Sequence, residues 1–395
     1  MSFYRSRNAV LLAKQETTEG VDAAPTGTNA VKIENLKVTY GTTLIKTNEV
    51  SGSLDVSPQI IGGTKVTMTF DVYLKGNGAP GTTAPEWGVL LTACGWTQTL
   101  TAAAIGVPTA ITAGTASQVT LPAAFSGANE AYRGMPLLLT GTVPTGFGGQ
   151  STILDFNSTS KIALLTDTAS GAFTTSALAQ IPPNALYTPG SSSIPSNTFY
   201  AYLDGLLIKM FGARGTFKIS LPAEGPMKAS FTFTGLFGGE SDSSNPSPTY
   251  DVALKPIWKN AGGLVGGPGA FTINAVAIGV KTFNFDNGNT LVLPDDPNSN
   301  EGFDGGQITM RDLTCDVDPY QTTIATRDIM TDLRAGTARP IHVRLGATTG
   351  NRVSLTLPSA LYIGGDPIDN GGLMARTLKC DVTGNDAAGA QLCVY

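Results

Sequence analysis

The residue types that could perform enzyme chemistry are few in this chain, and the first of them is a single histidine, His342. It stands in the run PIHVRLG, where Val343 and Leu345 alternate with polar positions as in a strand. A histidine can serve as a general base. One histidine, however, cannot form an HExxH zinc motif, which needs two. Any Ser-His-Asp triad would have to use His342 itself. We interpret His342 as a structural or exposed strand residue and expect no catalytic residue.

Part of a calcium loop is present near DDPNSNEGFDGG. Asp296, Asn298 and Asn300 occupy positions 1, 3 and 5 of an EF-hand spacing. Position 6, a glycine in EF-hands, is Glu301, and position 12, which requires a bidentate glutamate, is Gln307. The segment is therefore predicted to be a polar connecting loop, and we expect neither a metal nor a cofactor.

Three other patterns favour structural roles. The glycine-rich run Gly262–Gly269 lacks the Lys-Ser/Thr that follows in a phosphate-binding loop, so we predict a linker. Arg214, in GARG, could contact a phosphate, but one arginine cannot line a DNA groove, so we predict an ion pair within a domain or between subunits. The four cysteines are widely spaced and are predicted to be buried thiols, with a bridge across the last hairpin as the minor alternative for the last two. They are Cys94, Cys315, Cys380 and Cys393.

Composition favours an all-β protein of two or three domains. The chain has 395 residues, of which 14% are charged and 71 are glycine or proline, as expected for many short strands joined by tight turns. The net charge of −5 argues against a protein that grips nucleic acid through its phosphates, which requires clustered lysine and arginine. No apolar run reaches the roughly 18 residues of a membrane span, and the apolar stretch near the N-terminus is too short for a signal peptide. We expect unexported synthesis and no contact with a membrane.

Periodicity predicts the elements that would position these residues. Thr64–Leu74 alternates apolar and polar side chains as a half-buried strand does. Pro85–Cys94 carries Trp87 and three further apolar residues at helical spacing and is followed by a glycine, which predicts a short amphipathic helix. A second helix is predicted over Pro319–Ala335, with Asp318 as N-cap, Pro319 at the first helical position and a glycine as the stop.

The order of elements suggests two copies of one module. A strand, a short helix and further strands occur twice along the chain, although the two copies share no evident residue identity. The span 99–196 differs in kind, since only 5 of its 98 residues are charged, against 50 of the other 297. We interpret 99–196 as an inserted small β domain because strand-like stretches occur within it.

Two widely separated stretches resemble the siphophage major tail tube protein family. They are Leu11–Thr26 (LLAKQETTEGVDAAPT) and Gly212–Phe237 (GARGTFKISLPAEGPMKASFTFTGLF), and the likeness continues through Glu49–Leu74 and Pro85–Trp96. The resemblance implies a mainly β fold of two tandem tail-tube-like β-sandwich or barrel modules, each with one short helix, plus the inserted domain. The predicted domains are 1–98 and 197–261 for the first module, 99–196 for the insertion on the tube exterior, and 262–395 for the second module.

The same resemblance implies a structural role and no enzymatic activity. The subunit would stack as rings into the tube of a long, non-contractile tail, assembled in the host cytoplasm, through which DNA passes without specific binding. Two modules per chain favour a trimeric ring with pseudo-sixfold symmetry, with a hexamer as the alternative. Implied partners are the tape measure, tail terminator and distal tail proteins. The loop Leu44–Lys65 would make contacts between stacked rings, with an ordinary exposed loop as the alternative. The N-terminal arm Met1–Thr28 would likewise be ordered only by a neighbour.

A rival interpretation is an adhesive or carbohydrate-binding β protein of the virion tail. Such a protein would need exposed aromatic side chains on a concave face. The three tryptophans, Trp87, Trp96 and Trp258, do not cluster in the sequence pattern, which disfavours this rival. A β-helical glycosidase is disfavoured as well, because no regular repeat bearing paired carboxylates is visible.

Overall fold

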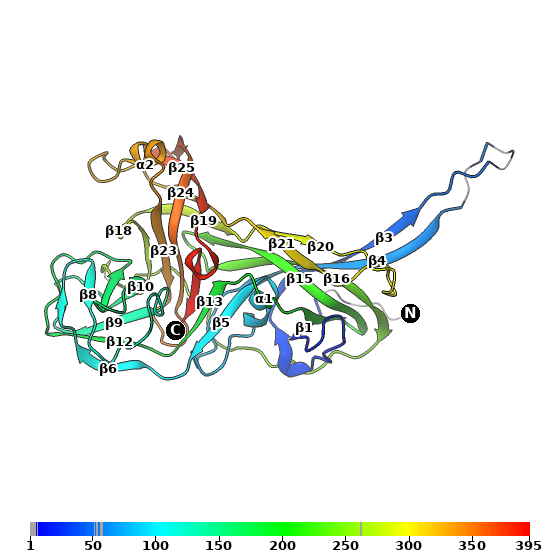
Figure 1. Ribbon diagram of the computed structural model, residues 1–395, viewed down its shortest axis with the longest axis horizontal. Coiled ribbons are helices and arrows are strands. Elements are labelled where there is room, and N and C mark those ends of the chain that lie inside the picture. The colour runs from blue at the N-terminus through cyan, green and yellow to red at the C-terminus, as the bar shows by residue number, and fades with distance from the viewer. Residues whose placement is uncertain (1–4, 6, 51, 53, 56–57, 261–262) are drawn as a thin grey trace.

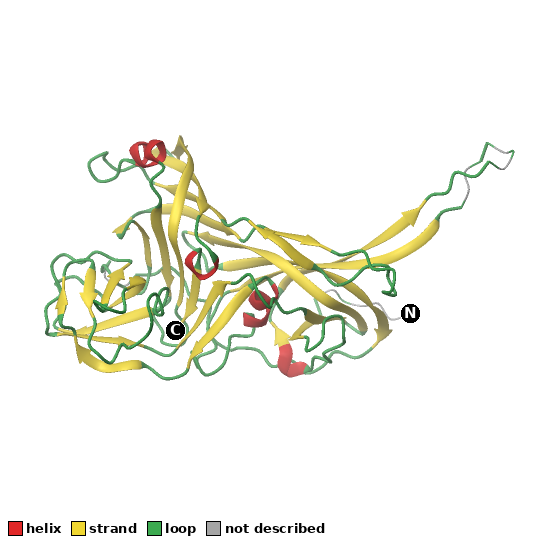
Figure 2. Ribbon diagram, in the orientation of Figure 1, coloured by secondary structure: helices red, strands yellow, loops and turns green. Residues whose placement is uncertain are grey.

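Strands dominate the architecture, as Figure 2 shows. The computed structural model describes residues 5, 7–50, 52, 54–55, 58–260 and 263–395. The mainly β fold is thereby confirmed. Most strands belong to one large, branched sheet that runs along the body of the subunit (Figure 1). They are β1 (Ala9–Gln15), β2 (Ala30–Val31), β3 (Glu34–Ile45), β4 (Ile60–Tyr73), β5 (Trp96–Thr101), β13 (Asn184–Pro189), β14 (Asn197–Leu203), β15 (Leu206–Pro222), β16 (Lys228–Asp242), β17 (Ala270–Ile273), β18 (Val276–Ala277), β19 (Val280–Asp286), β22 (Thr314–Pro319), β23 (Arg339–Leu345), β24 (Val353–Asn370), β25 (Leu373–Val382) and β26 (Gln391–Val394).

The remaining elements form two small sheets and short helices. The first small sheet has seven strands and the second is a two-stranded ribbon. The seven are β6 (Ile105–Ala110), β7 (Ala113–Gly114), β8 (Gln118–Thr120), β9 (Pro136–Gly141), β10 (Gln150–Phe156), β11 (Ile162–Leu165) and β12 (Ala177–Ile181), and the ribbon is β20 (Asn289–Val292) and β21 (Gln307–Arg311). The helices are α1 (Gly88–Ala93) and α2 (Ile329–Ala335), with single 3₁₀ turns at Gly27–Asn29 and Asp386–Ala388.

The large sheet contains the same four-strand arrangement twice. The strands β3, β4, β16 and β15 lie side by side in that order, and so do β19, β22, β25 and β24. In each unit the first two strands pair, a short helix follows, and a long hairpin then adds its returning strand to the second strand. The chain order and the spatial order therefore agree between the two units, which we call unit one and unit two.

Strand β15 joins the two units into one continuous sheet. One of its edges pairs with β16 along most of its length, while the other pairs first with β14 and then with β19. The joint to β19 runs from Lys218↔Asp286 to Pro222↔Thr282. The two units also share one hydrophobic core, which includes Phe70 and Phe231 from unit one and Val317 and Leu378 from unit two.

The predicted alternation of β4 and of the β15–β16 hairpin is confirmed. Val66, Met68, Phe70 and Val72 are all buried, and so are Phe217, Phe231 and Phe233 of the hairpin. The Phe70 ring lies 5.9 Å, centroid to centroid, from each of the two hairpin rings of β16. This aromatic cluster forms the centre of unit one.

The first predicted helix is present as α1, which is shorter than the predicted span. Trp87, Leu90, Leu91 and Cys94 are fully buried, as their helical spacing requires. Gly95 ends the helix with φ of +80°, a conformation that favours glycine. The helix lies on β5 and β1 in the core of unit one.

The start of the second helix was predicted wrongly. Pro319 is the last residue of β22, where it pairs with Val280, and α2 begins ten residues later. Strand β22 runs through Val317, which is buried in the sheet, and ends at Pro319. Proline is tolerated at a strand end as well as in the first turn of a helix. The N-cap is Asp328, whose carboxylate accepts the backbone N–H of Thr331 at 3.0 Å. The predicted glycine stop is confirmed, since the C-cap is a glycine with φ of +63°.

The N-terminal segment is held by its own chain. Strand β1 pairs along its length with β14, from Ala9↔Leu203 to Gln15↔Asn197. Strand β14 of the same chain supplies the pairing, so the prediction that a neighbour must order the N-terminal segment Met1–Thr28 is wrong for Ala9–Gln15. Residues 1–4 and 6 of that arm, and 262 of the predicted linker, lie outside the described residues.

The seven-stranded sheet carries its own hydrophobic core, formed largely by residues between Ile105 and Ile181. On either side of it, β5 and β13 pair with each other in the large sheet, from Trp96↔Pro189 to Thr101↔Asn184. Strand β13, although inside the predicted span 99–196, also pairs with β26. We refer to residues 102–183 as the small domain.

All four cysteines are buried free thiols, as predicted. Cys380 lies directly opposite Cys315 on neighbouring strands. Cys393 instead lies on β26 and packs in the core of the small domain. The minor alternative of a bridge between Cys380 and Cys393 is wrong, because β26 pairs with the other end of β24 from β25.

The central aromatic cluster yields a prediction about stability. Replacing Phe70 with alanine removes a ring from a fully packed core, and we expect the free energy of unfolding to fall by about 3–5 kcal/mol. Chemical denaturation of the isolated subunit measures it. The exposed Thr39→Ala on the neighbouring strand is the control and should change stability by less than about 0.5 kcal/mol. Equal effects of the two changes would contradict the assignment of the core.

Candidate assembly interface and the contacts behind it

A two-stranded arm projects from the body of the subunit (Figure 1). Strand β4 pairs with β16 only from Lys65 onward, whereas its pairing with β3 continues to Ile45↔Ile60. We call residues 42–64 the arm; residues 51, 53, 56 and 57 of its loop lie outside the described residues. Several apolar side chains of the arm are exposed, which indicates a surface for another chain. They are Leu44, Ile45, Val50, Leu54, Ile60 and Ile61.

The root of the arm is held by the acidic loop between β20 and β21. The backbone N–H of Thr64 donates to the Glu301 carboxylate at 2.6 Å. Next to it, a Cβ on Gly63 would lie 1.8 Å from the Glu301 carbonyl oxygen, so only glycine permits this close approach. The loop predicted to be a polar connection thus braces the arm where it leaves the sheet.

The same loop has no metal-binding arrangement. The Asp296 carboxylate accepts the backbone N–H of Asn298 at 2.8 Å, an ordinary turn within the loop. Among the described residues, no group of three or more histidine, cysteine, aspartate or glutamate side chains is placed to hold a metal ion.

Arg214 forms an ion pair within the subunit. Its guanidinium binds the Glu19 carboxylate with two hydrogen bonds of 2.8 and 2.9 Å and also donates to the carbonyl oxygens of Ile194 and Gly306. Gln307 donates to the same carboxylate at 2.7 Å. One side chain therefore ties β15 to the N-terminal segment, to the approach to β14 and to the ribbon of unit two.

A second carboxylate of the N-terminal segment, Glu16, lies beside this pair. It is nearly buried and accepts hydrogen bonds from Ser196, Thr198 and the backbone N–H groups of Gly20 and Gly212. Neither glutamate was assigned a role from the sequence. Both lie in the run ETTEG, and each has one partner in the run GARG, Gly212 for Glu16 and Arg214 for Glu19, so the two stretches that carried the resemblance contact each other.

A fully buried ion pair fastens the small domain to unit two. Arg344 of β23 donates to the Asp167 carboxylate at 3.1 and 3.2 Å and to the carbonyl oxygen of Gly267 at 2.9 Å. Ser151 donates to Asp167 at 2.7 Å. Burial alone would raise the pKa of Asp167, but the neighbouring guanidinium holds that pKa below its ordinary value.

His342 lies buried in the same junction, so the exposed alternative of the sequence interpretation is wrong. Its Nδ1 is 2.9 Å from the hydroxyl of Thr356 on β24, and its Nε2 is 3.5 Å from the hydroxyl of Thr152 in the small domain. Burial, together with the Arg344 guanidinium, lowers the pKa of His342 to about 3. The imidazole is therefore neutral at pH 7 and bridges two domains by hydrogen bonds.

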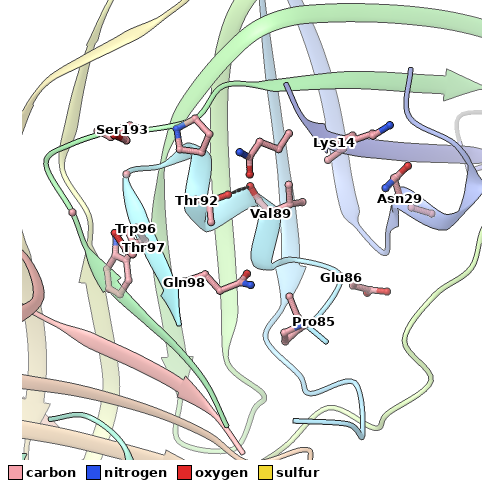
Figure 3. Close-up of a pocket in the computed structure, with 18 of the residues that line it drawn as sticks. Lys14, Asn29, Pro85, Glu86, Val89, Thr92, Trp96, Thr97, Gln98 and Ser193 are labelled. Carbon is pink, nitrogen blue, oxygen red and sulfur yellow. Dashed lines mark hydrogen bonds between the residues drawn. The ribbon is translucent and has the colours of Figure 1, made fainter. Parts of the chain in front are cut away.

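A groove beside α1 has a volume of about 720 Å³ and lies between α1, β1, β5 and the segment before β14 (Figure 3). Its charged lining includes Lys14 and Glu86. Glu86 accepts the backbone N–H of Asp251 at 2.8 Å and pairs with Lys75, and burial raises its pKa. The lining residues include no histidine or cysteine.

Comparison with known families identifies the family of this chain. A family model described as phage tail tube protein matches residues 6–383, nearly the whole chain. The chain belongs to the phage tail tube protein family. No curated protein matches the sequence. This family is a structural component of the virion tail, so the arm and the sheet edges of this tail tube protein are its candidate assembly interface.

Neither of the helices that the structure describes in this tail tube protein is long and apolar enough to cross a membrane.

The buried histidine predicts a pH dependence of stability. The unfolded chain binds a proton at His342 with a pKa near 6.5, while the folded chain does so only near 3. The unfolded state therefore binds more protons between these values, and stability falls as the pH falls through this window. At pH 4.5 the penalty from this group is about 2.5 kcal/mol relative to pH 7.

Chemical denaturation at pH 7 and pH 4.5 measures this penalty, with His342→Gln as the comparison. The variant lacks the titrating group, so its loss of stability between the two pH values should be smaller than that of the natural chain. An equal loss in both proteins would show that His342 does not carry the effect.

Proposed function

We propose that the subunit closes into rings that stack into the tube of a long, non-contractile phage tail and form the channel for genomic DNA. The observation that carries the proposal is a continuous sheet of two units with an unpaired edge at each end. Among the described strands, β3 pairs with β4 alone, and beyond Ala360 β24 pairs with β25 alone. Exposed strand edges are templates for another chain.

The joint inside the subunit supplies the pattern for the joint between subunits. In chain order, β15 is the third strand of unit one and β19 is the first strand of unit two, and these two strands pair. Repetition of that rule pairs β24, the third strand of unit two, with β3 of the next copy. Such a head-to-tail contact uses two different surfaces and closes into a ring when the rotation permits.

The two surfaces are complementary in charge and in polarity. The lining of a groove of about 910 Å³ at the start of β3 includes apolar side chains, the basic residues Arg5, Arg7 and Lys32, and one acidic residue, Glu34. The tip of the β24–β25 hairpin exposes Leu373 and Met374 and carries Asp366 and Asp369. Charge complementarity of this kind favours the correct partner and its register.

The number of units per chain supports a trimer. Three copies of two units give six units around the ring, the pseudo-sixfold trimer, and six copies give twelve units, the hexameric alternative. Because the two units have the same arrangement of strands, the β15–β19 joint inside each subunit would correspond to every second joint around a ring of six units.

A passive channel suits the charges of the sheet. Lys218 pairs with Asp286 at 2.8 Å and Lys228 with Asp71 at 3.0 Å, so these cations are compensated. Together with the net charge of −5, this leaves little positive field to hold phosphates, and DNA would slide without specific binding. The small domain would block an open lumen, so the proposal places it on the outside of the tube.

The adhesive or carbohydrate-binding alternative is less well supported. Sugar-binding surfaces present exposed aromatic rings, whereas all five aromatic side chains of the small domain are buried. These are Phe125, Tyr132, Phe147, Phe156 and Phe173. Trp87 and Trp96 are buried in the core as well.

In the tail, the tube would meet a tape measure protein inside and the terminator and distal tail proteins at its ends, after assembly in the host cytoplasm.

Electron cryomicroscopy of the purified protein at high concentration tests this function. We expect hollow tubes of stacked rings with three copies per ring, β24 of each copy beside β3 of the next, and the small domain on the outer surface. Density for the small domain inside the lumen would refute its placement. A protein that stays monomeric and binds a glycan array would favour the adhesive alternative.

The arm gives a second test. Because Ile45 and Ile60 are directly paired, replacing residues 46–59 by Asn-Gly should close a tight hairpin turn without disturbing the sheet. We expect the shortened protein to keep the melting temperature of the natural chain and to lose the ability to form long tubes, as seen by negative-stain microscopy. Tubes of normal length from this variant would contradict the assembly role of the arm.

A further inference from the structure

A pocket of about 300 Å³ lies beside α2, at the end of the subunit opposite the arm. Its walls come from the turn between β17 and β18, the segment that precedes α2, the helix itself and β24. Exposed apolar side chains, including Ile324 and Val276, lie at its edge. We call it the α2 pocket.

Three buried hydrogen-bond donors in the α2 pocket have no well-aligned acceptor among the described residues, although the Arg327 guanidinium and the Tyr362 hydroxyl interact with each other. They are Nη1 and Nη2 of Arg327 and the hydroxyl of Tyr362, all three buried atoms. Tyr362 is only 3% exposed. Burial raises the pKa of this phenol to about 12, and the nearby guanidinium opposes that shift. Buried donors without acceptors are rare in native proteins and point to a group supplied from elsewhere.

The acidic groups of the same pocket are already engaged. Asp332 binds Arg339 with two hydrogen bonds, of 2.9 and 2.5 Å. Asp328 caps α2 by accepting the backbone N–H and the hydroxyl of Thr331. Arg327 is therefore left without a hydrogen-bonded carboxylate among the residues that the structure describes.

The unpartnered donors define the class of ligand. A guanidinium presents parallel N–H groups that match the two oxygens of a carboxylate, and a phenol O–H adds a third donor to the same group. The apolar edge favours a ligand whose carboxylate stands next to an apolar side chain. A glutamate beside an exposed aliphatic residue meets both requirements.

The arm carries such a pair. Glu49 is exposed, and the adjacent Val50 is fully exposed, with 101% relative accessibility. In Figure 1, α2 and the free end of the arm lie on the same long side of the subunit and at its opposite ends. Copies repeated end to end, as in the proposed ring, would bring the arm of one copy over the α2 end of its neighbour.

We propose that the α2 pocket binds the Glu49 carboxylate from the arm of an adjacent copy, with Arg327 and Tyr362 as its donors and Val50 against the apolar edge. The inference rests on the proposed function, because it requires self-assembly. It identifies a receiving site for the arm and gives the buried donors their missing acceptor.

Charge exchange between the two residues tests the proposal. Glu49→Arg and Arg327→Glu should each lower the assembled fraction in a sedimentation assay by about tenfold or more, and the double variant should recover to within about threefold of the natural chain. Glu224→Arg, at the exposed turn between β15 and β16, is the matched control and should assemble normally. Circular dichroism and melting temperature verify that every variant folds.

The outcomes distinguish a failure of the proposed function from a failure of the pocket assignment. Failure of the natural chain to assemble under any condition would overturn the proposed function, and the pocket assignment with it. Normal assembly of Arg327→Glu, or a double variant that does not recover, would overturn the pocket assignment alone.

Cross-linking provides a measurement that does not depend on the extent of assembly. The pair Glu49→Cys and Ile324→Cys should form an intermolecular disulfide on treatment with diamide, which accepts the two electrons and two protons that the thiols lose. We expect covalent oligomers on a non-reducing gel. The native cysteines are buried, and Glu49→Cys with Val107→Cys in the small domain should give none. Absence of oligomers in assembled samples of the first pair would overturn the proposal.

Discussion

The ion pair between Arg214 and Glu19 is the contact on which the arrangement of the sheet depends. Arg214 follows a bulge of β15 in which Gly212 has φ of +59°, and the register between β15 and β16 shifts between Phe211 and Arg214. Just after this bulge, β15 stops pairing with β14 and goes on to pair with β19. A nearly buried guanidinium without its carboxylate would be strongly destabilising, so the N-terminal segment is required where the two units join.

The junction with the small domain uses the same physical solution. Asp167 and Arg344 are both buried, and their remaining hydrogen-bonding capacity is taken up by Ser151 and by the carbonyl oxygen of Gly267. A buried pair tolerates little displacement, because its attraction offsets the cost of desolvation only at short distance. The small domain is consequently fixed to unit two rather than tethered by a flexible linker, which is consistent with its proposed position on the outside of the tube.

The joints inside the subunit and the two ends of the subunit differ in whether their bonding groups have partners. Inside the subunit, the buried pairs Arg214–Glu19 and Arg344–Asp167 match cations with carboxylates at the joints. At the two ends, unpaired strand edges, the apolar arm and the unpartnered donors beside α2 remain unused by the single chain. A subunit that is complete in its core and incomplete at its ends has the properties expected of a component that repeats.

The sequence by itself determined which side chains face the core, because apolar residues at spacing two or at helical spacing fix one face of a strand or helix wherever that element packs. The burial of Phe70 and of Trp87, and the all-β character, follow from local pattern alone. Local pattern could not place the start of α2, since a proline suits both the first turn of a helix and the end of a strand, and only pairing with Val280 decided for the strand. Nor could it choose partners: Glu19 and Arg214 are 195 residues apart, and His342 becomes neutral because a separate domain covers it. The tertiary structure decided these contacts because they depend on which buried faces meet, and periodicity along one segment carries no information about the segment that will cover it.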